Sequence, residues 1–448
     1  MSEKLLNYLK HVQVYIETRN CHKLLGCLTI NPGKAEGELR ASFPEPNDFD
    51  LYSIPEKFQP VVINHLKVIK AIHRDNSLAA AFEYSNEMVL SLTRASESSE
   101  FLWIQPVLLD CFRELVLVYT VKEKQDPDDL ENFSEMEGMD DGGGEFGSGK
   151  SISCLEKLAI TFNKGFKLSL NDKNPDLAKS RRNDIYFYLA NLIKIYFKLK
   201  KYELAKSVQK AVTGTRNPLP KMKDCKNHKK YCVVYLYYSA FMALDDGDYR
   251  SSEADLDLAL SLIQDYQDYA KSKQFQQIMM LLLPLKLYNQ GKLPSKRFWL
   301  QNPSLRVMYR DNIFRAVLQG DISKFDHAIK NFRIVLLKNR LYVLIESLRQ
   351  YCQLSLVRKT VGMIKEIKND HIISLSAFQL AFEYSQYHEQ DFSINFDFAK
   401  DHSYNTTIAE VECILANLIA SGKVKGYISH AQRCIVLSKS NPFPKISN

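Results

Sequence analysis

Long apolar runs are missing from this sequence of 448 residues. A helix that spans a membrane needs roughly 20 consecutive, mainly apolar residues, and no such run occurs. Residues 1–20 also lack the apolar stretch and the small-residue cleavage site of a signal peptide, so we expect them to form an amphipathic first helix. We therefore expect no membrane partner.

Catalytic motifs are missing as well. The ten His residues form neither a His-x-His pair nor an H-E-x-x-H motif, which are zinc-binding patterns of metalloproteases. No G-x-S-x-G turn is present to hold a nucleophilic serine. The sequence therefore predicts a protein that is not an enzyme, has no catalytic residues and needs no cofactor.

The nine cysteines form no disulfide framework, because their number is odd and their spacing is irregular. Scattered thiols of this kind favour a reducing compartment, and we expect the protein in the nucleus and cytoplasm. Cys225, His228 and Cys232 are spaced as three zinc ligands would be, but a structural zinc site needs four and no fourth lies nearby. We therefore expect no metal site, with Cys225 in a loop and Cys232 in the core of a helix.

A P-loop pattern, G-x-x-x-x-G-K-[ST], occurs at residues 144–151. In a working P-loop a buried strand delivers the glycines, so that their backbone N–H groups surround phosphate oxygens. Here residues 137–143 are acidic and glycine-rich with no strand pattern, and Glu145 would add a negative charge beside the phosphates. We interpret this stretch as a linker that leads into a helix N-cap at Ser151 or Ser153.

Charge is spread unevenly along the chain. The net charge is +8, yet residues 125–149 contain nine acids and no Lys or Arg, so the rest of the chain carries +17. An acidic, glycine-rich segment cannot bury enough apolar surface to offset its ordering entropy, and we predict that residues 122–150 are a disordered insert. The basic remainder suits nucleic acid or an acidic polypeptide, although solvated helical faces would account for it without any partner.

Helical periodicity dominates the rest of the sequence. Residues 184–199 are apolar on nearly all sides, as a helix inside a stack of tetratricopeptide-like repeats must be. In contrast, the proline and glycine residues of 31–60 predict a long connection with little regular structure. The helices expected from the pattern are 63–72, 78–92, 102–121, 184–199, 202–212, 231–244, 250–263, 274–287, 305–318, 323–336, 340–356, 359–367 and 375–384.

The spacing of apolar residues changes from a helical to a strand-like period within residues 410–437. Apolar residues first recur at i, i+3, i+4 and i+7, which predicts an amphipathic helix that ends at Gly422. Alternation then predicts a strand with Lys425 and Tyr427 on the face away from the core, followed by a second strand at 434–437. Helix, strand, turn and strand form the end of a winged helix.

These elements resemble the PCI domain, a helical-repeat and winged-helix module of the proteasome lid, the signalosome and translation initiation factor three. The resemblance is greatest to the branch of signalosome-associated PCI proteins and PCI subunits of nuclear messenger-RNA export and splicing complexes. It implies a mostly α fold, a right-handed, tetratricopeptide-like solenoid of helical repeats that ends in a winged-helix domain. The blocks that carry it are LLPLKL at 282–287, GKLPS at 291–295, AVLQGDISKFDHAI at 316–329, LYVLIESLR at 341–349 and SKSNPFP at 438–444.

The resemblance also implies an organisation and a role. The expected parts are N-terminal helical repeats at 1–121, the acidic insert at 122–150, PCI helical repeats at 151–370, and a winged-helix subdomain with a C-terminal tail at 371–448. Such a chain would be a non-catalytic scaffold that pairs with a second PCI protein and a small, acidic, disordered subunit of the proteasome-lid type. Together they would form a platform for RNA or DNA in nuclear messenger-RNA export or splicing. Alternatively, the chain would be an accessory structural subunit of the COP signalosome, acting in cullin deneddylation.

Two sets of basic residues are the candidate binding sites. The first set lies at the wing, which is the pair of strands and the turn expected at residues 424–437. Gly426 is expected to allow a close backbone approach there. The nearby cations would follow a phosphate backbone without reading bases. The nucleic-acid candidates are Lys423, Lys425, His430, Arg433 and Lys439. The candidates for an acidic partner are Lys221, Lys223, Lys229, Lys230, Arg297, Arg306 and Arg310. The alternatives are that the wing pairs with another PCI subunit and that the loop cations are only solvated.

Overall fold

The protein is described here by a computed structural model that covers residues 3–125, 153–225, 228–368, 370–386 and 405–444. Its chain forms two compact units, Met1–Tyr235 and Leu236–Asn448. None of the helices in the described ranges combines the length and the apolar character that crossing a bilayer demands. The two units are defined by contacts within the chain, whereas the four parts expected from the sequence were defined by its pattern and by the resemblance. The four-part organisation therefore stays a prediction.

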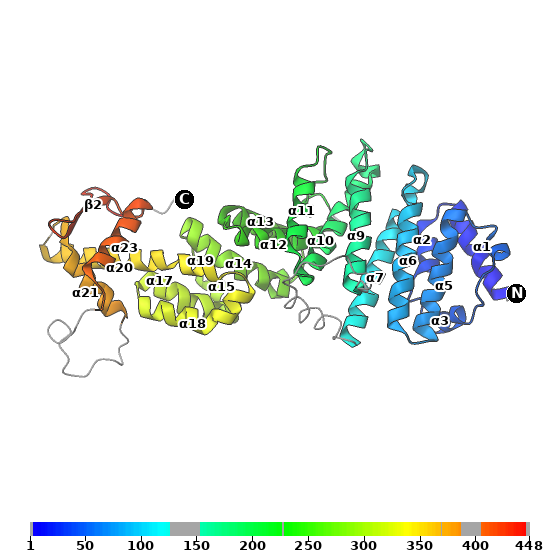
Figure 1. The fold of residues 1–448 in the computed structure, drawn as a ribbon, viewed down its shortest axis with the longest axis horizontal. Coiled ribbons are helices and arrows are strands. Elements are labelled where there is room, and N and C mark those ends of the chain that lie inside the picture. The colour runs from blue at the N-terminus through cyan, green and yellow to red at the C-terminus, as the bar shows by residue number, and fades with distance from the viewer. Residues whose placement is uncertain (1–2, 126–152, 226–227, 369, 387–404, 445–448) are drawn as a thin grey trace, which may run out of the picture. The chain divides into compact units, whose positions relative to one another are not determined.

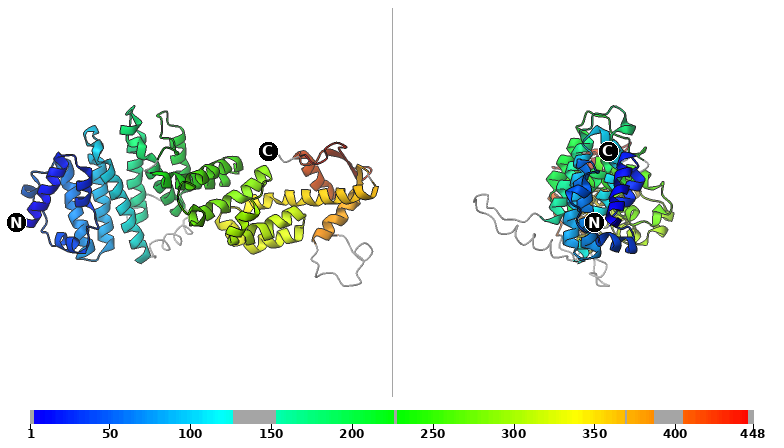
Figure 2. Two further views of the ribbon diagram at one scale, coloured as in Figure 1. Left: turned by 180° about the vertical axis from the view of Figure 1, so that it is seen from behind. Right: turned by 90° about the vertical axis from the view of Figure 1, so that its right-hand side faces the viewer.

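Helices that stand side by side make up the first unit (Figures 1 and 2). Helices α5, α6, α7, α9 and α10 each pack against their neighbours in the sequence. The elements are α1 (Glu3–Glu17), α2 (Cys21–Leu28), α3 (Lys34–Ala41), α4 (Asp48–Leu51), η1 (Glu56–Phe58), α5 (Gln59–His73), α6 (Leu78–Ala95), η2 (Ser99–Ile104), α7 (Gln105–Gln125), α9 (Cys154–Leu170), η4 (Leu177–Lys179), η5 (Arg181–Asp184), α10 (Ile185–Lys198), α11 (Tyr202–Thr213) and the start of α12 (Lys229–Asp245).

An aromatic cluster fills the centre of this unit, as the apolar character of residues 184–199 predicts. The ring of Phe112 in α7 lies 4.8 Å from that of Phe162 in α9 and 5.2 Å from that of Tyr188 in α10. Gly165 makes the close packing possible, because a Cβ atom there would lie 2.5 Å from the Tyr188 ring. The prediction that residues 184–199 form a helix packed inside the stack is therefore confirmed.

The prediction of little regular structure at residues 31–60 is wrong. Helix α3 lies inside this range and packs against α5. Gly37 allows the approach, because a Cβ atom at this position would lie 2.4 Å from the ring of His73. The buried side chain of Arg40 adds a hydrogen bond from Nη1 to the carbonyl of Cys27 at 2.7 Å. These tertiary contacts stabilise a short helix whose local sequence signals are weak.

The second unit continues with helices before it ends in a small sheet. The helix expected at 305–318 is present, but its middle is π-helical. The expected division into helices 340–356 and 359–367 is wrong, because α20 runs unbroken across residue 357. The break falls at Leu348, whose N–H donates to the carbonyl of Ile345 at 2.9 Å in a tighter turn. The elements are α13 (Tyr249–Ile263), η7 (Tyr269–Lys271), α14 (Lys273–Gln290), α15 (Lys296–Gln301), α16 (Pro303–Leu305), η8 (Arg306–Phe314), α17 (Arg315–Gln319), α18 (Ile322–Lys338), α19 (Tyr342–Ser347) and α20 (Arg349–Lys368).

A winged helix forms the end of the second unit (Figure 1). Its strands pair antiparallel in the order β1-β3-β2. Thr407 caps the second helix with a reciprocal pair of hydrogen bonds to Glu410, and Gly422 follows it with a φ of +69°. The helix and both final strands were expected from the sequence, whereas β1 was not. The elements are β1 (Ile372–Ser374), α21 (Leu375–Gln386), α23 (Ile408–Ala420), β2 (Gly426–Ser429) and β3 (Cys434–Leu437).

Two predictions fall on segments that the structure does not describe. The P-loop pattern at 144–151 lies wholly outside the described residues, as does all of the predicted insert beyond Gln125. The expected helix start just after it is described, and Ser153 is the N-cap of α9. Its hydroxyl accepts a hydrogen bond from the N–H of Glu156 at 3.2 Å, and the Glu156 carboxylate accepts one from the N–H of Ser153.

Candidate binding face of the winged helix

Two backbone hydrogen bonds fix Lys425, the residue just before β2. The N–H of Lys425 donates to the carbonyl of Pro442 at 2.9 Å, and the N–H of Ser438 donates to the carbonyl of Lys425 at 2.8 Å. Gly426 comes next, and a Cβ atom there would lie 2.4 Å from the carbonyl oxygen of Val436 on β3. The close approach expected of this glycine is therefore present, and it fixes the position from which the Lys425 side chain extends.

Alternation along this segment places its side chains as the sequence predicts. Val424 is buried, with 1% of its surface exposed, whereas Tyr427 is 63% exposed. Lys425 is also exposed. A cation and an aromatic ring therefore lie on the outer side of the wing, where they can contact another molecule.

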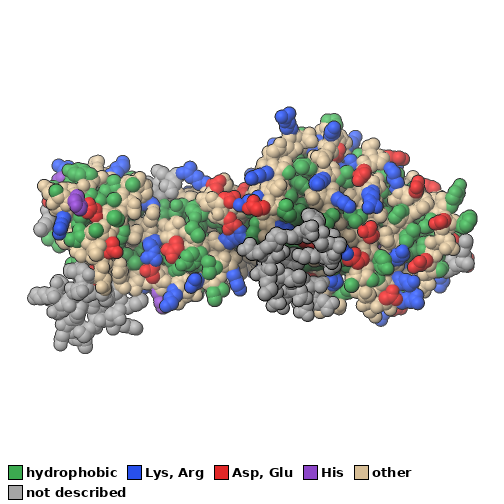
Figure 3. All heavy atoms as spheres, viewed as in Figure 1, with side chains coloured by type: hydrophobic (Ala, Val, Ile, Leu, Met, Phe, Trp, Pro, Cys, Tyr) green, Lys and Arg blue, Asp and Glu red, His purple; other side chains and the backbone are tan. Residues whose placement is uncertain are grey.

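The turn between β2 and β3 carries a second exposed cation, Arg433. Its φ is +48°, and its carbonyl accepts a hydrogen bond from the N–H of Leu375, the first residue of α21, at 2.9 Å. Lys439, just beyond β3, is exposed as well. On the face drawn in Figure 3, basic side chains at the winged-helix end lie among hydrophobic ones.

The other two predicted residues, Lys423 and His430, already contact side chains of the protein itself. The Nζ of Lys423 lies 2.6 Å from the Oε1 of Gln350 and 4.7 Å from the ring centre of Tyr351, both on α20. Burial lowers the pKa of Lys423. His430 is exposed, but its Nδ1 lies 2.9 Å from the Oε2 of Glu412 on α23. Of the five predicted residues, Lys425, Arg433 and Lys439 are thus the ones best placed to meet an anionic partner.

An apolar surface on α20 and β1 was missed by the sequence analysis. Met363 and Ile367 lie one helical turn apart on α20 and are 57% and 79% exposed, and Ile372 on β1 is 47% exposed. Strand β1 is an edge strand of the three-stranded sheet. The signal that could have found this surface is that the last turns of α20 carry more apolar residues than one buried face needs.

In the first unit, the candidate lysines in the loop before α12 and at the start of α12 are mostly exposed. Lys221, Lys223 and Lys230 extend into solvent, and the Nζ of Lys230 lies 4.9 Å from the ring centre of Tyr231. Lys229 is half-buried. The loop itself is anchored, because the carbonyls of Pro218 and Pro220 accept hydrogen bonds from the side chains of Arg182 and Tyr186 at 2.7 and 3.1 Å.

The remaining three candidates for an acidic partner belong to the second unit. Arg297 is exposed, Arg310 is half-buried, and the Nε of Arg306 lies 3.0 Å from the Oδ2 of Asp311. Because the two groups of cations belong to different units, each is a candidate surface by itself.

The zinc-like spacing at residues 225–232 has another explanation in the structure. The buried thiols of Cys225 and Cys232 share a hydrogen bond, which lowers the pKa of Cys225. The ring of His228 faces Asp184 instead, with its Nε2 2.8 Å from Oδ1. Within the described ranges, no group of three or more His, Cys, Asp or Glu side chains could hold a metal ion.

Helical repeats that end in this winged helix define a PCI-type protein, and the sequence comparison agrees. Residues 331–439 match the PCI domain family. The match runs from the middle of α18 to just beyond β3, so it covers the whole winged helix and the long helix that precedes it.

Relatives that match over nearly the whole chain show which family of PCI-domain proteins it belongs to. The chain is 47% identical to the Protein CSN12 homolog of Debaryomyces hansenii, and the match covers 100% of this chain and 99% of the relative. It is 26% identical to the Protein CSN12 homolog of Schizosaccharomyces pombe over 88% of this chain and 84% of the relative. It is also 25% identical to the zebrafish PCI domain-containing protein 2, over 99% of this chain and 98% of the relative. The chain belongs to the CSN12-homolog family of PCI-domain proteins.

Proposed function

We propose that the chain is a non-catalytic scaffold subunit of a nuclear messenger-RNA processing or export complex, present in nucleus and cytoplasm. It pairs with a second PCI protein through the winged helix, presents a basic face to RNA or DNA, and holds a small acidic subunit on its helical repeats. The observation that supports this proposal is the pairing of exposed cations with an exposed apolar surface at the winged-helix end.

The cations support contact with a phosphate backbone. Lys425 and Arg433 are exposed on a backbone that hydrogen bonds hold in place, and Lys439 follows β3. Lysine and arginine side chains that meet phosphates displace bound counterions, which supplies affinity without base recognition. Tyr427, which is exposed beside them, offers a ring on which an unpaired base can stack.

The apolar surface supports pairing with a protein. Met363, Ile367 and Ile372 expose large apolar side chains, and exposed apolar groups beside an unpaired strand edge are typical of protein–protein contacts. An edge strand can also add backbone hydrogen bonds from a partner strand. The basic and apolar surfaces would then serve two different partners.

A role in the COP signalosome is the second candidate function. It is favoured by the names of the relatives, several of which are called CSN12 homolog. In that assembly the chain would be an accessory structural subunit, because the sequence has no metalloprotease motif for cullin deneddylation.

Co-purification of the tagged full chain from its own cells distinguishes the two functions. We expect one second PCI protein and one small acidic chain in stoichiometric amounts. Recovery of intact signalosome subunits in those amounts would favour the alternative, and recovery of neither would contradict both.

The double variant Met363→Asp, Ile367→Asp tests the pairing surface. Two buried carboxylates at an interface core would be unpaired, so recovery of the second PCI protein should fall by about tenfold or more. Leu300→Asp is the matched control, because Leu300 is 72% exposed on α15 in the same unit. If recovery of the second PCI protein falls equally with the control, or does not fall with the double variant, α20 is not part of the interface.

A further inference from the structure

Two aromatic side chains of the first unit extend into solvent and have no role in the proposed function. Phe49 and Tyr52 are each 90% exposed, whereas the next most exposed large apolar side chain in the described ranges, that of Ile367, is 79% exposed. The two rings lie three residues apart at α4, so they extend from one side of a single helical turn. We call residues 45–57 the aromatic tip. Neighbouring exposed rings of this kind are typical of a contact with another protein.

The backbone beneath the two rings is held in place by buried anchors. Leu51 and Ile54 are each 2% exposed. Their carbonyls accept hydrogen bonds from the side-chain amide of Gln59, at 3.2 and 3.1 Å. At the start of α4, the N–H of Asn47 donates to the Oδ2 of Asp50 at 2.9 Å. Because this backbone is already ordered, little entropy is lost when the rings bind a partner.

The charges of the aromatic tip disfavour a nucleic acid as its partner. Its exposed charged residues are three acids and one cation, namely Glu45, Asp48, Glu56 and Lys57. The Nζ of Lys57 lies 5.5 Å from the ring centre of Phe101. Unpaired bases can stack on exposed rings, but the acids would repel the phosphates that join those bases. The aromatic tip therefore suits a protein surface that places cations beside an apolar groove.

A groove with these properties lies between α1, α2 and α3 of the same unit. Its volume is about 550 Å³, within the range of roughly 300–1,000 Å³ that is usual for binding pockets. Its accessible apolar surface comes from Leu39, which is 39% exposed, and from the half-buried rings of Tyr15 and Phe43. Gly26 on α2 keeps one side of the groove open, because a Cβ atom there would meet nothing within 4 Å.

Lys4 and Lys23 give the groove a positive rim. Both are exposed, and neither has a carboxylate partner in the part of the chain that the structure describes. The Nζ of Lys23 lies 5.6 Å from the ring centre of Tyr15. The lining also contains one Arg and one acid, but these are paired with each other, Arg40 with Glu36. The rim is therefore complementary in charge to the acids of the aromatic tip.

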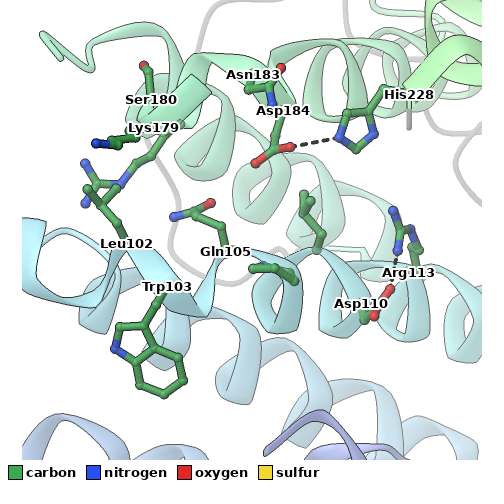
Figure 4. Close-up of a pocket in the computed structure, with 13 residues that line it drawn as sticks. Leu102, Trp103, Gln105, Asp110, Arg113, Lys179, Ser180, Asn183, Asp184 and His228 are labelled. Atoms are coloured by element: carbon green, nitrogen blue, oxygen red, sulfur yellow. Dashed lines mark hydrogen bonds and ion pairs between the residues drawn. The ribbon is translucent and has the colours of Figure 1, made fainter. Parts of the chain in front are cut away.

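The larger cavity of the first unit, of about 690 Å³, matches the aromatic tip less well. Figure 4 shows the ring of His228 directed at Asp184, and Arg113 beside Asp110 on the opposite wall. Arg181 in the same lining is paired with an acid of the loop after α9. These charged side chains serve contacts within the chain, so the groove at α1 is the better match.

The aromatic tip and the groove belong to one unit, and α1 packs against both α2 and α4. Two copies related by a twofold axis can therefore each insert a tip into the groove of the other. An aromatic side chain buries about 150–250 Å², so four rings bury about 600–1,000 Å² and the two grooves lose a similar area. The total of about 1,200–2,000 Å² is the size of a stable interface.

We propose that the chain forms a symmetric homodimer in which Phe49 and Tyr52 of each copy fill the groove over Leu39 of the other. The acids of each aromatic tip then face Lys4 and Lys23 of the opposite copy. This contact involves the first unit alone, so it goes beyond the function proposed for the winged helix.

Sedimentation of the full chain alone, from about 1 to 100 μM, tests the dimer. Interfaces of this size have μM or tighter affinity, so the measured mass should rise from the 51.7 kDa of one chain toward twice that value. The double variant Phe49→Ala, Tyr52→Ala should raise the dimer dissociation constant by at least about tenfold. Ile160→Ala, at a 47% exposed position on α9, is the matched control and should not. A wild type that stays monomeric throughout, or no effect of the double variant, would overturn the proposal.

Gly26→Leu tests the groove without removing any contact of the fold. The added side chain occupies open space, and leucine forms helices better than glycine, so α2 should persist while the dimer weakens by about tenfold. The variant Met363→Asp, Ile367→Asp changes the second unit and should dimerise as the wild type does. If Gly26→Leu leaves the dimer unchanged, or if the second-unit variant is the one that loses it, the contact lies elsewhere and the proposal fails.

A charge exchange tests the pairing of tip with rim. Glu45→Lys, Asp48→Lys reverses the aromatic tip, and Lys4→Glu, Lys23→Glu reverses the rim, so each variant alone brings like charges together and should stay monomeric. In an equimolar mixture, opposite charges meet at both contacts of a mixed pair, and the dimer should return. A mixture with no more dimer than the separate variants would contradict the proposed pairing.

Discussion

His65 is a buried residue whose protonation state can be read from its contacts. It is 0% exposed in α5, its Nε2 lies 3.0 Å from the carbonyl of Thr29, and its Nδ1 lies 3.1 Å from the hydroxyl of Tyr8. Burial is the main cause that lowers the pKa of His65 from 6.5 to about 4, and the nearby positive charge of Arg40 acts in the same direction. The ring is therefore neutral in the folded protein above pH 4.

This shift predicts a loss of stability in acid. Between pH 6.5 and pH 4 the unfolded chain binds a proton at His65 that the folded chain does not, so the free energy of unfolding falls as the pH falls. The full effect is about 3 kcal/mol, from 1.36 kcal/mol for each pH unit of the shift. Urea unfolding across this range should show a steeper decline for the wild type than for His65→Gln. Parallel declines would mean that His65 does not titrate in this way.

At the scale of elements, the wing depends on one small residue. Gly426→Ala should destabilise the winged helix by about 1–3 kcal/mol, because the added methyl group would meet the backbone oxygen of Val436, which cannot move without breaking the sheet. Gly362→Ala is the matched control. Its Cβ would meet nothing within 4 Å, and alanine in a helix interior should stabilise α20 by roughly 0.5–1 kcal/mol. Thermal unfolding of both variants checks this, and a stable Gly426→Ala would contradict the account.

The sequence predicts elements well where their period is long and their ends are marked. Helix α23 has a clear apolar stripe, an N-cap at Thr407 and a glycine after its end, so it could be recognised by itself. Strand β1 has only three residues and forms through pairing with β3, a contact that no local pattern reveals. Helix α3 was missed for a similar reason, since packing of Gly37 against α5 compensates for its weak local signal.

At the scale of the whole molecule, the sequence predicts which regions carry charge but not which charges are exposed. The alternating pattern around β2 placed Lys425 and Tyr427 on the outer side, and both are exposed. Lys423 belongs to the same basic run, yet it packs on Tyr351 of α20, more than seventy residues earlier in the chain.

The central claim is that the winged helix binds a nucleic acid through Lys425, Arg433 and Lys439. A mobility-shift titration with single-stranded RNA, repeated at several salt concentrations, measures this directly on the complex with the second PCI protein. Reversal of the three cations to Glu should weaken binding and reduce the slope of log affinity against log salt by about 2, at roughly 0.7 for each phosphate contact. Reversal of Lys10, Lys34 and Lys164, which are exposed in the first unit, should leave that slope unchanged. Equal affinities and slopes for both triple variants would contradict the claim.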